Sequence, residues 1–264
     1  MNQAYLRRTA PTLDRGRLRA AIEDAFTNLA LHPERRFHFV SGAPLARRLG
    51  YTQAMLDGVP REALASFSGV GNPFRMDGIE RGLQVLAVGC GSGVDSLIAA
   101  RMVGPRGRVI GGDMTAAMVE RAQDSVLRAG VANVSIEWGH AECLPLPDAS
   151  VDVVISNGVV VLTPDKRDTF REIARVLRPG GLLRIADVVV QWRIPPYVAE
   201  ATHLWTECIG GATWLEDYAP LLRGAGFVEP RVAEIFDVFA GTEVERNSSM
   251  FRARGANVAA RLPG

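Results

Sequence analysis

Glycines at alternate positions mark the first candidate site. The run Gly89-Cys90-Gly91-Ser92-Gly93 lies between an apolar stretch and a helical pattern, and glycines there let a ligand approach the backbone closely. The spacing is GxGxG, which differs from the GxGxxG of dinucleotide-binding turns, and no Gly-Lys-Ser/Thr phosphate loop is present. Asp113 stands 20 residues after Gly93, at the end of the next apolar stretch. A carboxylate there can accept both hydroxyls of a ribose. Together the loop and the acid predict an adenosine-containing ligand; a merely tight turn and a helix N-cap are the alternative interpretations.

Other reactive side chains give weaker signals. The three cysteines, Cys90, Cys143 and Cys208, form no CxxC pair, and the four histidines have no metal-ligand spacing, so we expect neither a metal site nor a disulfide framework. A reduced, cytoplasmic setting fits this cysteine usage. His203 and Glu207 stand four residues apart, so one helix face would bring them together as a base and its orienting carboxylate, or as a surface ion pair.

The elements that must position these groups alternate between strand and helix patterns. Strand patterns cover 84–88, 108–112, 134–138, 151–156 and 182–190, and helical patterns cover 94–102, 115–129 and 165–177. This alternation predicts an α/β fold, a Rossmann-like, doubly wound and mainly parallel sheet. Two further strands, 226–239 and 251–262, would pair antiparallel at its edge and make seven strands in all.

Two additions to the sheet are expected. Residues 1–80 predict a helical N-terminal cap, with helices at 18–29, 44–49 and 61–67. Residues 81–264 would form the main domain. Within it, an insertion at 191–225, after the fifth strand, carries helices at 197–209 and 214–225.

Composition excludes several classes of protein. The 264 residues carry a net charge of +1 and are 47% hydrophobic, so no overall field favours nucleic acid or a membrane surface. No apolar run approaches the ~18 residues of a membrane span. Lys166 is the only lysine among 30 basic residues, which suggests a GC-rich, bacterial coding bias. The oligomeric state stays open, with a homodimer as one option.

Longer motifs point to a family. The runs VLAVGCGSG, VIGGDMT, GHAECLPLPDASVDVVISN and REIARVLRPGG lie within residues 60–190, and this region resembles the class I S-adenosylmethionine-dependent methyltransferases. Within that family the chain looks most like the arsenite methyltransferase branch, on the runs GVGNP (69–73), SNGVVVLTPDK (156–166) and ECIGGA (207–212). The resemblance implies S-adenosylmethionine as cofactor and S-adenosylhomocysteine as product.

The resemblance also assigns roles to residues. It implies that the glycine loop holds the methionine part of the cofactor, that an acid holds the ribose, and that a later loop borders the adenine. A residue after the fourth strand would lie beside the reaction centre. In that order the assigned residues are Gly89, Cys90, Gly91 and Gly93; Asp113, with Met114 over one adenine face; His140, Ala141 and Glu142; and Asn157.

The chain departs from the branch at several of these positions. Arsenite enzymes hold trivalent arsenic with soft cysteine thiolates. The matching positions here are Val70, Gly158 and Cys208, so one cysteine of three remains and arsenite is disfavoured as the substrate. Most relatives also carry acids where this chain has Ala87 and His140, and we expect weaker cofactor binding as a result.

The substrate side is expected between residues 68–74 and 192–212. Phe74, Trp192, Tyr197 and Cys208 would frame a small molecule there, with His203 as the candidate base, assisted by Glu207; His38 is a further candidate. Three functions follow: methyl transfer to O, N, C or S of a small-molecule metabolite; methylation of arsenite or another metalloid; or a protein that keeps the fold and does other chemistry or only binds a ligand.

Overall fold

A single sheet organises the chain. The computed structural model describes residues 14–37 and 39–264, so residues 1–13 of the expected cap and His38 lie outside the described part. The sheet has eight strands in the order β3-β2-β1-β4-β5-β8-β7, with β6 paired to β5. Their bounds are β1 Gln84–Val88, β2 Arg108–Asp113, β3 Val134–Trp138, β4 Val151–Asn157, β5 Leu177–Val190, β6 Thr213–Trp214, β7 Val228–Phe236 and β8 Arg254–Arg261.

The direction of the strands confirms the doubly wound, mainly parallel sheet. The neighbours from β3 to β5 all run parallel, and β8 pairs antiparallel with both β5 and β7. The eighth strand, β6, was not predicted. It extends the end of β5 through the pairs Val189–Thr213 and Val190–Trp214. Two residues are too few for an alternating pattern to reveal.

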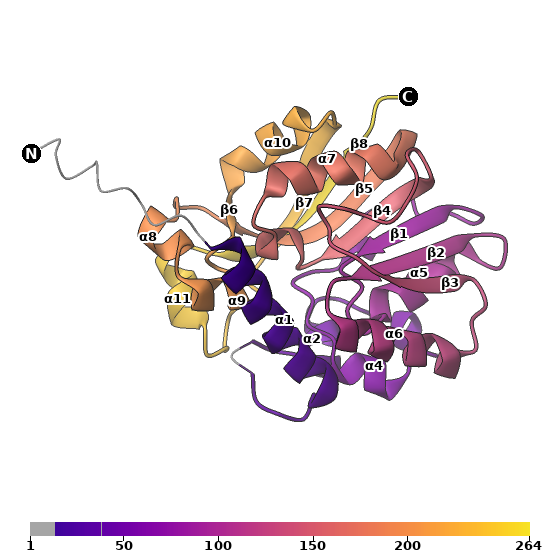
Figure 1. The fold of residues 1–264 in the computed structure, drawn as a ribbon, viewed down its shortest axis with the longest axis horizontal. Coiled ribbons are helices and arrows are strands. Elements are labelled where there is room, and N and C mark those ends of the chain that lie inside the picture. The colour runs from indigo at the N-terminus through magenta and orange to yellow at the C-terminus, as the bar shows by residue number, and fades with distance from the viewer. Residues whose placement is uncertain (1–13, 38) are drawn as a thin grey trace, which may run out of the picture.

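Helices cover both faces of the sheet. On one face α5 and α6 pack through an apolar cluster in which Ala99, Val119 and Ala122 meet Val85 and Val109. On the other face α7 and α10 pack through Phe170, Ile173 and Leu222, and they lie together at the top of Figure 1. The helices are α1 Arg15–Leu31, α2 Gly42–Arg48, α3 Gln53–Leu56, α4 Arg61–Ala65, α5 Val94–Val103, α6 Ala116–Ala129, α7 Lys166–Val176, α8 Pro196–Ala199, α9 Thr202–Thr206, α10 Leu215–Gly224 and α11 Glu245–Met250.

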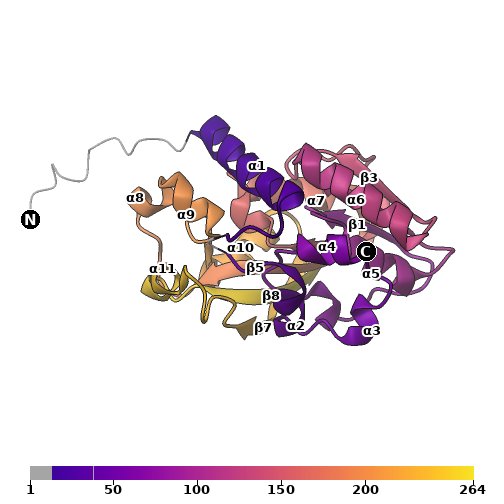
Figure 2. The same cartoon turned by 90° about the horizontal axis from the view of Figure 1, so that it is seen from below.

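The first helix lies across the carboxyl ends of the strands. Asp14 caps α1 by accepting hydrogen bonds from the backbone N–H groups of Gly16 and Arg17. Leu18 and Ile22 are buried in one cluster with Val188 of β5, so the helix packs on the main fold through its apolar stripe. In both views α8, α9 and α11 gather at the end of the molecule where α1 begins (Figures 1 and 2).

The segment after the fifth strand differs from the single helix expected over 197–209. Pro195 and Pro196 start α8, which ends at Ala199, and α9 spans only Thr202–Thr206. Cys208 then takes a left-handed φ of 59°, which a continuing helix does not allow. None of the helices in residues 14–37 and 39–264 is long and apolar enough to cross a membrane.

Candidate cofactor and substrate site

A deep cavity opens at the carboxyl ends of β1, β2 and β4. Its walls come from α1, residues 66–70, the glycine loop, residues 137–146, the segment around Glu207 and Cys208, and residues 238–244. Strand ends meet here because the parallel strands all point the same way, and open α/β sheets bind their ligands at this edge. The sheet therefore brings together residues that the sequence separates by more than a hundred positions.

The glycine loop and Asp113 form one hydrogen-bonded unit. Oδ2 of Asp113 accepts from the backbone N–H of Gly91 at 2.9 Å, and Oδ1 accepts from the N–H of Thr115 at 2.9 Å. Gly89 has a φ of 65°, and a Cβ there would collide with Val159. At Gly91, with a φ of 52°, an added Cβ would meet nothing within 4 Å, so the loop backbone faces open space. Burial raises the pKa of Asp113, while its backbone hydrogen bonds oppose that change.

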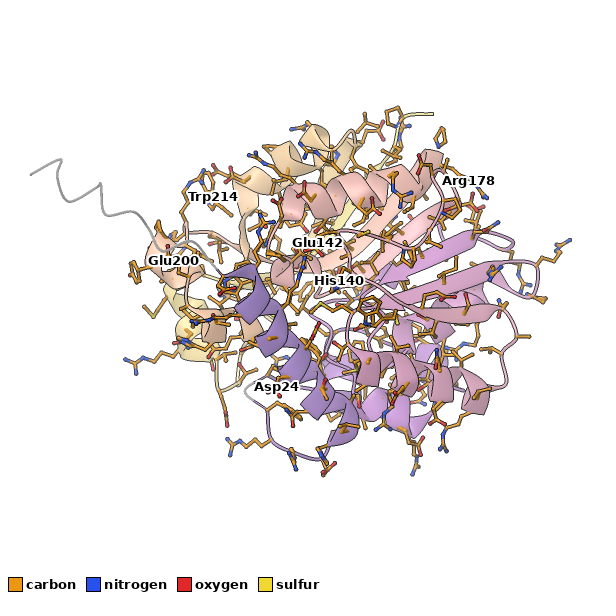
Figure 3. The ribbon with its side chains drawn as sticks, in the orientation of Figure 1. Asp24, His140, Glu142, Arg178, Glu200 and Trp214 are labelled. Carbon is orange, nitrogen blue, oxygen red and sulfur yellow. The ribbon has the colours of Figure 1, made fainter. Side chains whose placement is uncertain are left out.

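Residues after β2 and β3 line the next part of the cavity. Met114, Ala141 and Glu142 border it, and the indole Nε1–H of Trp138 donates to the Met114 carbonyl at 2.7 Å. Glu142 forms an ion pair of 3.3 Å with Arg19 of α1, which ties the helix to this loop. Figure 3 places His140 and Glu142 near the middle of the molecule, beside α1.

His140 differs from its neighbours in the loop. Its side chain is outside the cavity lining and packs edge-on against Trp138, with ring centroids 5.2 Å apart. Its Nδ1 atom is buried, and the described part of the chain offers it no hydrogen-bond partner. A buried nitrogen without a partner is uncommon, and this one lies outside the cavity that its neighbours Ala141 and Glu142 line.

Asn157 sits in a polar cluster that the sequence did not reveal. Its Oδ1 accepts from the N–H of Val70 at 2.8 Å, and its Nδ2 lies 3.0 Å from the hydroxyl of Tyr51 and 3.1 Å from Oδ2 of Asp95. The Tyr51 hydroxyl donates to Oδ1 of Asp95 at 2.7 Å. Asp95 and Asn157 line the cavity, and the hint in the sequence was an acid two residues after the last glycine of the loop.

Two of the expected substrate-side residues line the cavity. Glu207 does so while its Oε2 accepts from Nδ2 of Asn247 at 2.9 Å. Cys208 does so as well, and burial, reinforced by the charges of Asp187 and Glu207, raises the pKa of its thiol to about 12. The thiol is therefore protonated near neutral pH.

The structure places the other expected substrate-side residues outside the cavity lining. His203 lies within α9 but is exposed and outside the cavity lining, whereas Glu207, the C-cap of the same helix, borders the cavity. Trp192 and Tyr197 are 53% and 74% exposed and also lie outside the lining. Phe74 is half-buried behind the cavity wall, where its ring meets Tyr51 edge-on at 6.2 Å.

A second buried carboxylate lies behind the substrate side. Asp187 is fully buried and accepts from the Tyr218 hydroxyl at 2.8 Å and from the N–H of Val161 at 3.0 Å. Burial raises its pKa to about 6, and the positive charge of Lys166 opposes that change. Burial in turn lowers the pKa of Lys166 to about 8. Residues 14–37 and 39–264 contain no group of three or more His, Cys, Asp or Glu side chains placed to hold a metal ion.

The fold and this cavity define a class of protein. A model of the methyltransferase domain family matches residues 79–226, which is more than half of the chain. The chain belongs to the class I S-adenosylmethionine-dependent methyltransferase family, whose cofactor is S-adenosylmethionine.

Named relatives refine the comparison. An arsenite methyltransferase from Halobacterium salinarum is 41% identical over 165 residues, which cover 62% of this chain and 42% of that protein. A demethylmenaquinone methyltransferase from Listeria monocytogenes is 37% identical over 109 residues, 41% of this chain and 46% of that protein. The crystal structure of an arsenic(III) S-adenosylmethionine methyltransferase from Chlamydomonas reinhardtii superposes with a TM-score of 0.69 at 35% identity, over 85% of this chain and 75% of that one. The chain thus spans less than half the length of either curated relative.

The cavity fits the cofactor of this family. A buried carboxylate, Asp113, lies at the end of β2 and could accept hydroxyl groups of a ligand, and the glycine loop beside it faces open space. These groups suit the ribose and the chain that follows it in the cofactor, and the cavity continues past Asn157 to Glu207 and Cys208.

Proposed function

We propose that this protein transfers the methyl group of S-adenosylmethionine to an organic small molecule with a largely apolar body. The cofactor supplies an electrophilic methyl group on a sulfonium, so the protein has mainly to align the acceptor and exclude water. The apolar lining on the acceptor side supports this. It comprises Ile22, Phe26, Phe39, Val40, Leu45, Phe67, Val70, Leu162, Val238, Phe239 and Val244.

One observation carries the choice of an organic acceptor over arsenite. A Cβ added to Gly158 would lie 3.4 Å from a methyl group of Val70, so these two positions, which match thiolate positions of the arsenite branch, adjoin one another. Val70 carries an apolar side chain and Gly158 carries none, so Cys208 is the one thiol at the three positions. A soft trivalent arsenic would find no thiolate pair in this pocket.

Glu207 is the residue we assign to the acceptor's polar group. It is the carboxylate on the cavity wall next to Cys208, and Asn247 fixes one of its oxygens. A carboxylate at that place can take a proton from a hydroxyl or amine as the methyl is transferred. Replacement of Glu207 by Gln should lower turnover and leave cofactor affinity unchanged.

Formation of S-adenosylhomocysteine tests the proposal. The purified protein is incubated with S-adenosylmethionine and either arsenite with a thiol reductant or a panel of apolar phenols, quinols and amines. We expect product with members of the panel and none with arsenite. Arsenite turnover that is lost in Cys208→Ser would overturn the proposal in favour of the arsenite alternative. Binding of panel members without product would favour the alternative of a ligand-binding protein.

A gain-of-function variant tests the pocket itself. The double variant Val70→Cys/Gly158→Cys should acquire arsenite binding, which its matched control Val70→Ser/Gly158→Ser should not. Gly158 has a φ of 76°, so both variants carry the same backbone strain. Equal arsenite binding by both variants would show that the two positions do not form the pocket.

A further inference from the structure

Asp95 is a buried carboxylate on the cavity wall. Its residue is 9% exposed, and its two oxygens accept one hydrogen bond each, from the hydroxyl of Tyr51 and from the amide of Asn157. Both donors are uncharged. Burial raises the pKa of this carboxyl to about 6, and the two hydrogen bonds only partly oppose that change.

No cation in the described part of the chain forms an ion pair with this carboxylate. Within residues 14–37 and 39–264, none of the ion pairs involves Asp95. Of the other buried carboxylates with a raised pKa, Asp187 has the ammonium of Lys166 nearby, and Asp113 accepts from the backbone N–H groups of Gly91 and Thr115. A buried charge needs a partner, and the described residues offer Asp95 two uncharged side-chain donors.

The position of Asp95 identifies the part of the ligand that it faces. The glycine loop follows β1, which lies between β2 and β4. Asp113 ends β2 and anchors Gly91 on one side of the loop, and Asn157 ends β4 and holds Asp95 on the other. With the ribose at Asp113, the methionine part of the cofactor extends toward β4, where Asp95 lies.

We propose that Asp95 binds the α-ammonium group of S-adenosylmethionine. It would then take the place of the acid that most relatives carry at the position of Ala87. This rests on the proposed cofactor site. Ala87 is buried within β1 and cannot contact a charged group. Asp95, further along the chain in the first turn of α5, supplies the carboxylate from the helix instead. Tyr51 and Asn157 position it by occupying one lone pair of each oxygen.

This role differs from two others that a buried acid could have. A catalytic base would act on the acceptor and would leave cofactor affinity unchanged when removed. An acid in the first turn of a helix can also serve only to stabilise the helix dipole, and its loss would then affect folding without selectivity among ligands.

Calorimetric titration with two ligands separates these roles. S-Adenosylhomocysteine carries the α-ammonium group, whereas 5′-methylthioadenosine keeps the adenosine and the sulfur but lacks the amino-acid part. Asp95→Asn should weaken binding of S-adenosylhomocysteine by ~10–100-fold, the range for a lost hydrogen bond to a charged group, and should change binding of 5′-methylthioadenosine by less than about twofold. Asp113→Asn, the matched control on the ribose side, should weaken both ligands.

Each other outcome overturns the proposal. Unchanged affinity of Asp95→Asn for both ligands assigns Asp95 to catalysis or to the helix alone. An equal loss for both ligands means that the variant disturbs the glycine loop rather than an ammonium contact. If the wild-type protein binds neither ligand, the cofactor assignment fails together with the proposal. The titration of the wild-type protein distinguishes this result from the two outcomes above, in which the wild-type protein binds both ligands.

Discussion

Replacement of Asp95 by Asn should stabilise the ligand-free protein at alkaline pH, although it removes a side chain of the site. The folded-state pKa is about 6, compared with an ordinary value of 3.8. A pKa difference of one between the folded and unfolded protein corresponds to about 1.4 kcal/mol, so the ionised carboxylate costs up to ~3 kcal/mol at pH 8. Asparagine keeps a carbonyl for the Tyr51 hydroxyl, but its amide cannot accept from Asn157, which offsets ~1 kcal/mol of the gain. The net gain in the free energy of unfolding is ~2 kcal/mol at pH 8.

The sign of the pH dependence follows from the raised pKa. Between the unfolded and folded values, the folded state binds the proton more tightly, so the wild-type protein loses stability as pH rises through that window. The asparagine of the variant binds no such proton, and the advantage of the variant should shrink by ~1–1.5 kcal/mol between pH 8 and pH 5. Tyr51 is the other titratable group in contact with Asp95, and its pKa lies well above this range.

Urea denaturation of dialysed, cofactor-free protein at pH 8 and pH 5 measures both quantities. Asp24→Asn is the matched control, because Asp24 is an exposed carboxylate on α1 (Figure 3) and its replacement should change the stability little at either pH. A variant at position 95 that is less stable than the wild type at pH 8, or whose advantage does not depend on pH, would refute the claim that this charge is uncompensated.

Four further predictions concern the site and its surroundings. Asp113→Asn should weaken cofactor binding by ~1.5–3 kcal/mol in a calorimetric titration, because it removes the charge that accepts the ribose hydroxyls. Tyr218→Phe should lower the free energy of unfolding by ~1.5–3 kcal/mol in urea without changing cofactor affinity, because it removes a hydrogen bond to the buried carboxylate of Asp187. His203→Ala should leave both turnover and cofactor affinity at wild-type levels, since its side chain is exposed outside the cavity; a large loss of turnover would return it to the site. His140→Asp should tighten binding of S-adenosylmethionine if the loop turns this side chain toward the adenine, and unchanged affinity would agree with the placement of His140 outside the cavity lining.

The hydrophobic patterns of the sequence predicted the central strands and helices, because each pattern depends only on the residues of that one element. The apolar run of β4 is buried on both faces of the sheet, and a continuous apolar pattern is the signal of such a strand. The glycine loop directly follows β1, and Asp113 is the last residue of β2, so the strands that predict the fold also place these residues at the cavity.

Residues whose placement depends on distant contacts could not be predicted in this way. The Tyr51–Asp95 contact joins residues 44 positions apart and the Asn157–Asp95 contact joins residues 62 apart, across elements with no shared period. The bounds of the helix around His203 were wrong for a local reason instead. The 3.6-residue spacing suggested one helix, but the turn between α8 and α9 and the left-handed Cys208 divide that segment, and no glycine stands at either break.

One wall of the cavity belongs to α1, and this links the stability of the helix to ligand occupancy. Arg19, Ile22 and Phe26 of α1 face the cavity. This helix lies outside the sheet, and its buried apolar stripe and the Arg19–Glu142 ion pair attach it to the rest of the protein. A ligand that binds only when this wall is in place must stabilise the docked helix by its own free energy of binding. Amide hydrogen exchange along α1 should therefore slow in proportion to ligand saturation, so the first helix of the described chain becomes a reporter for finding the acceptor molecule without an assay of its chemistry.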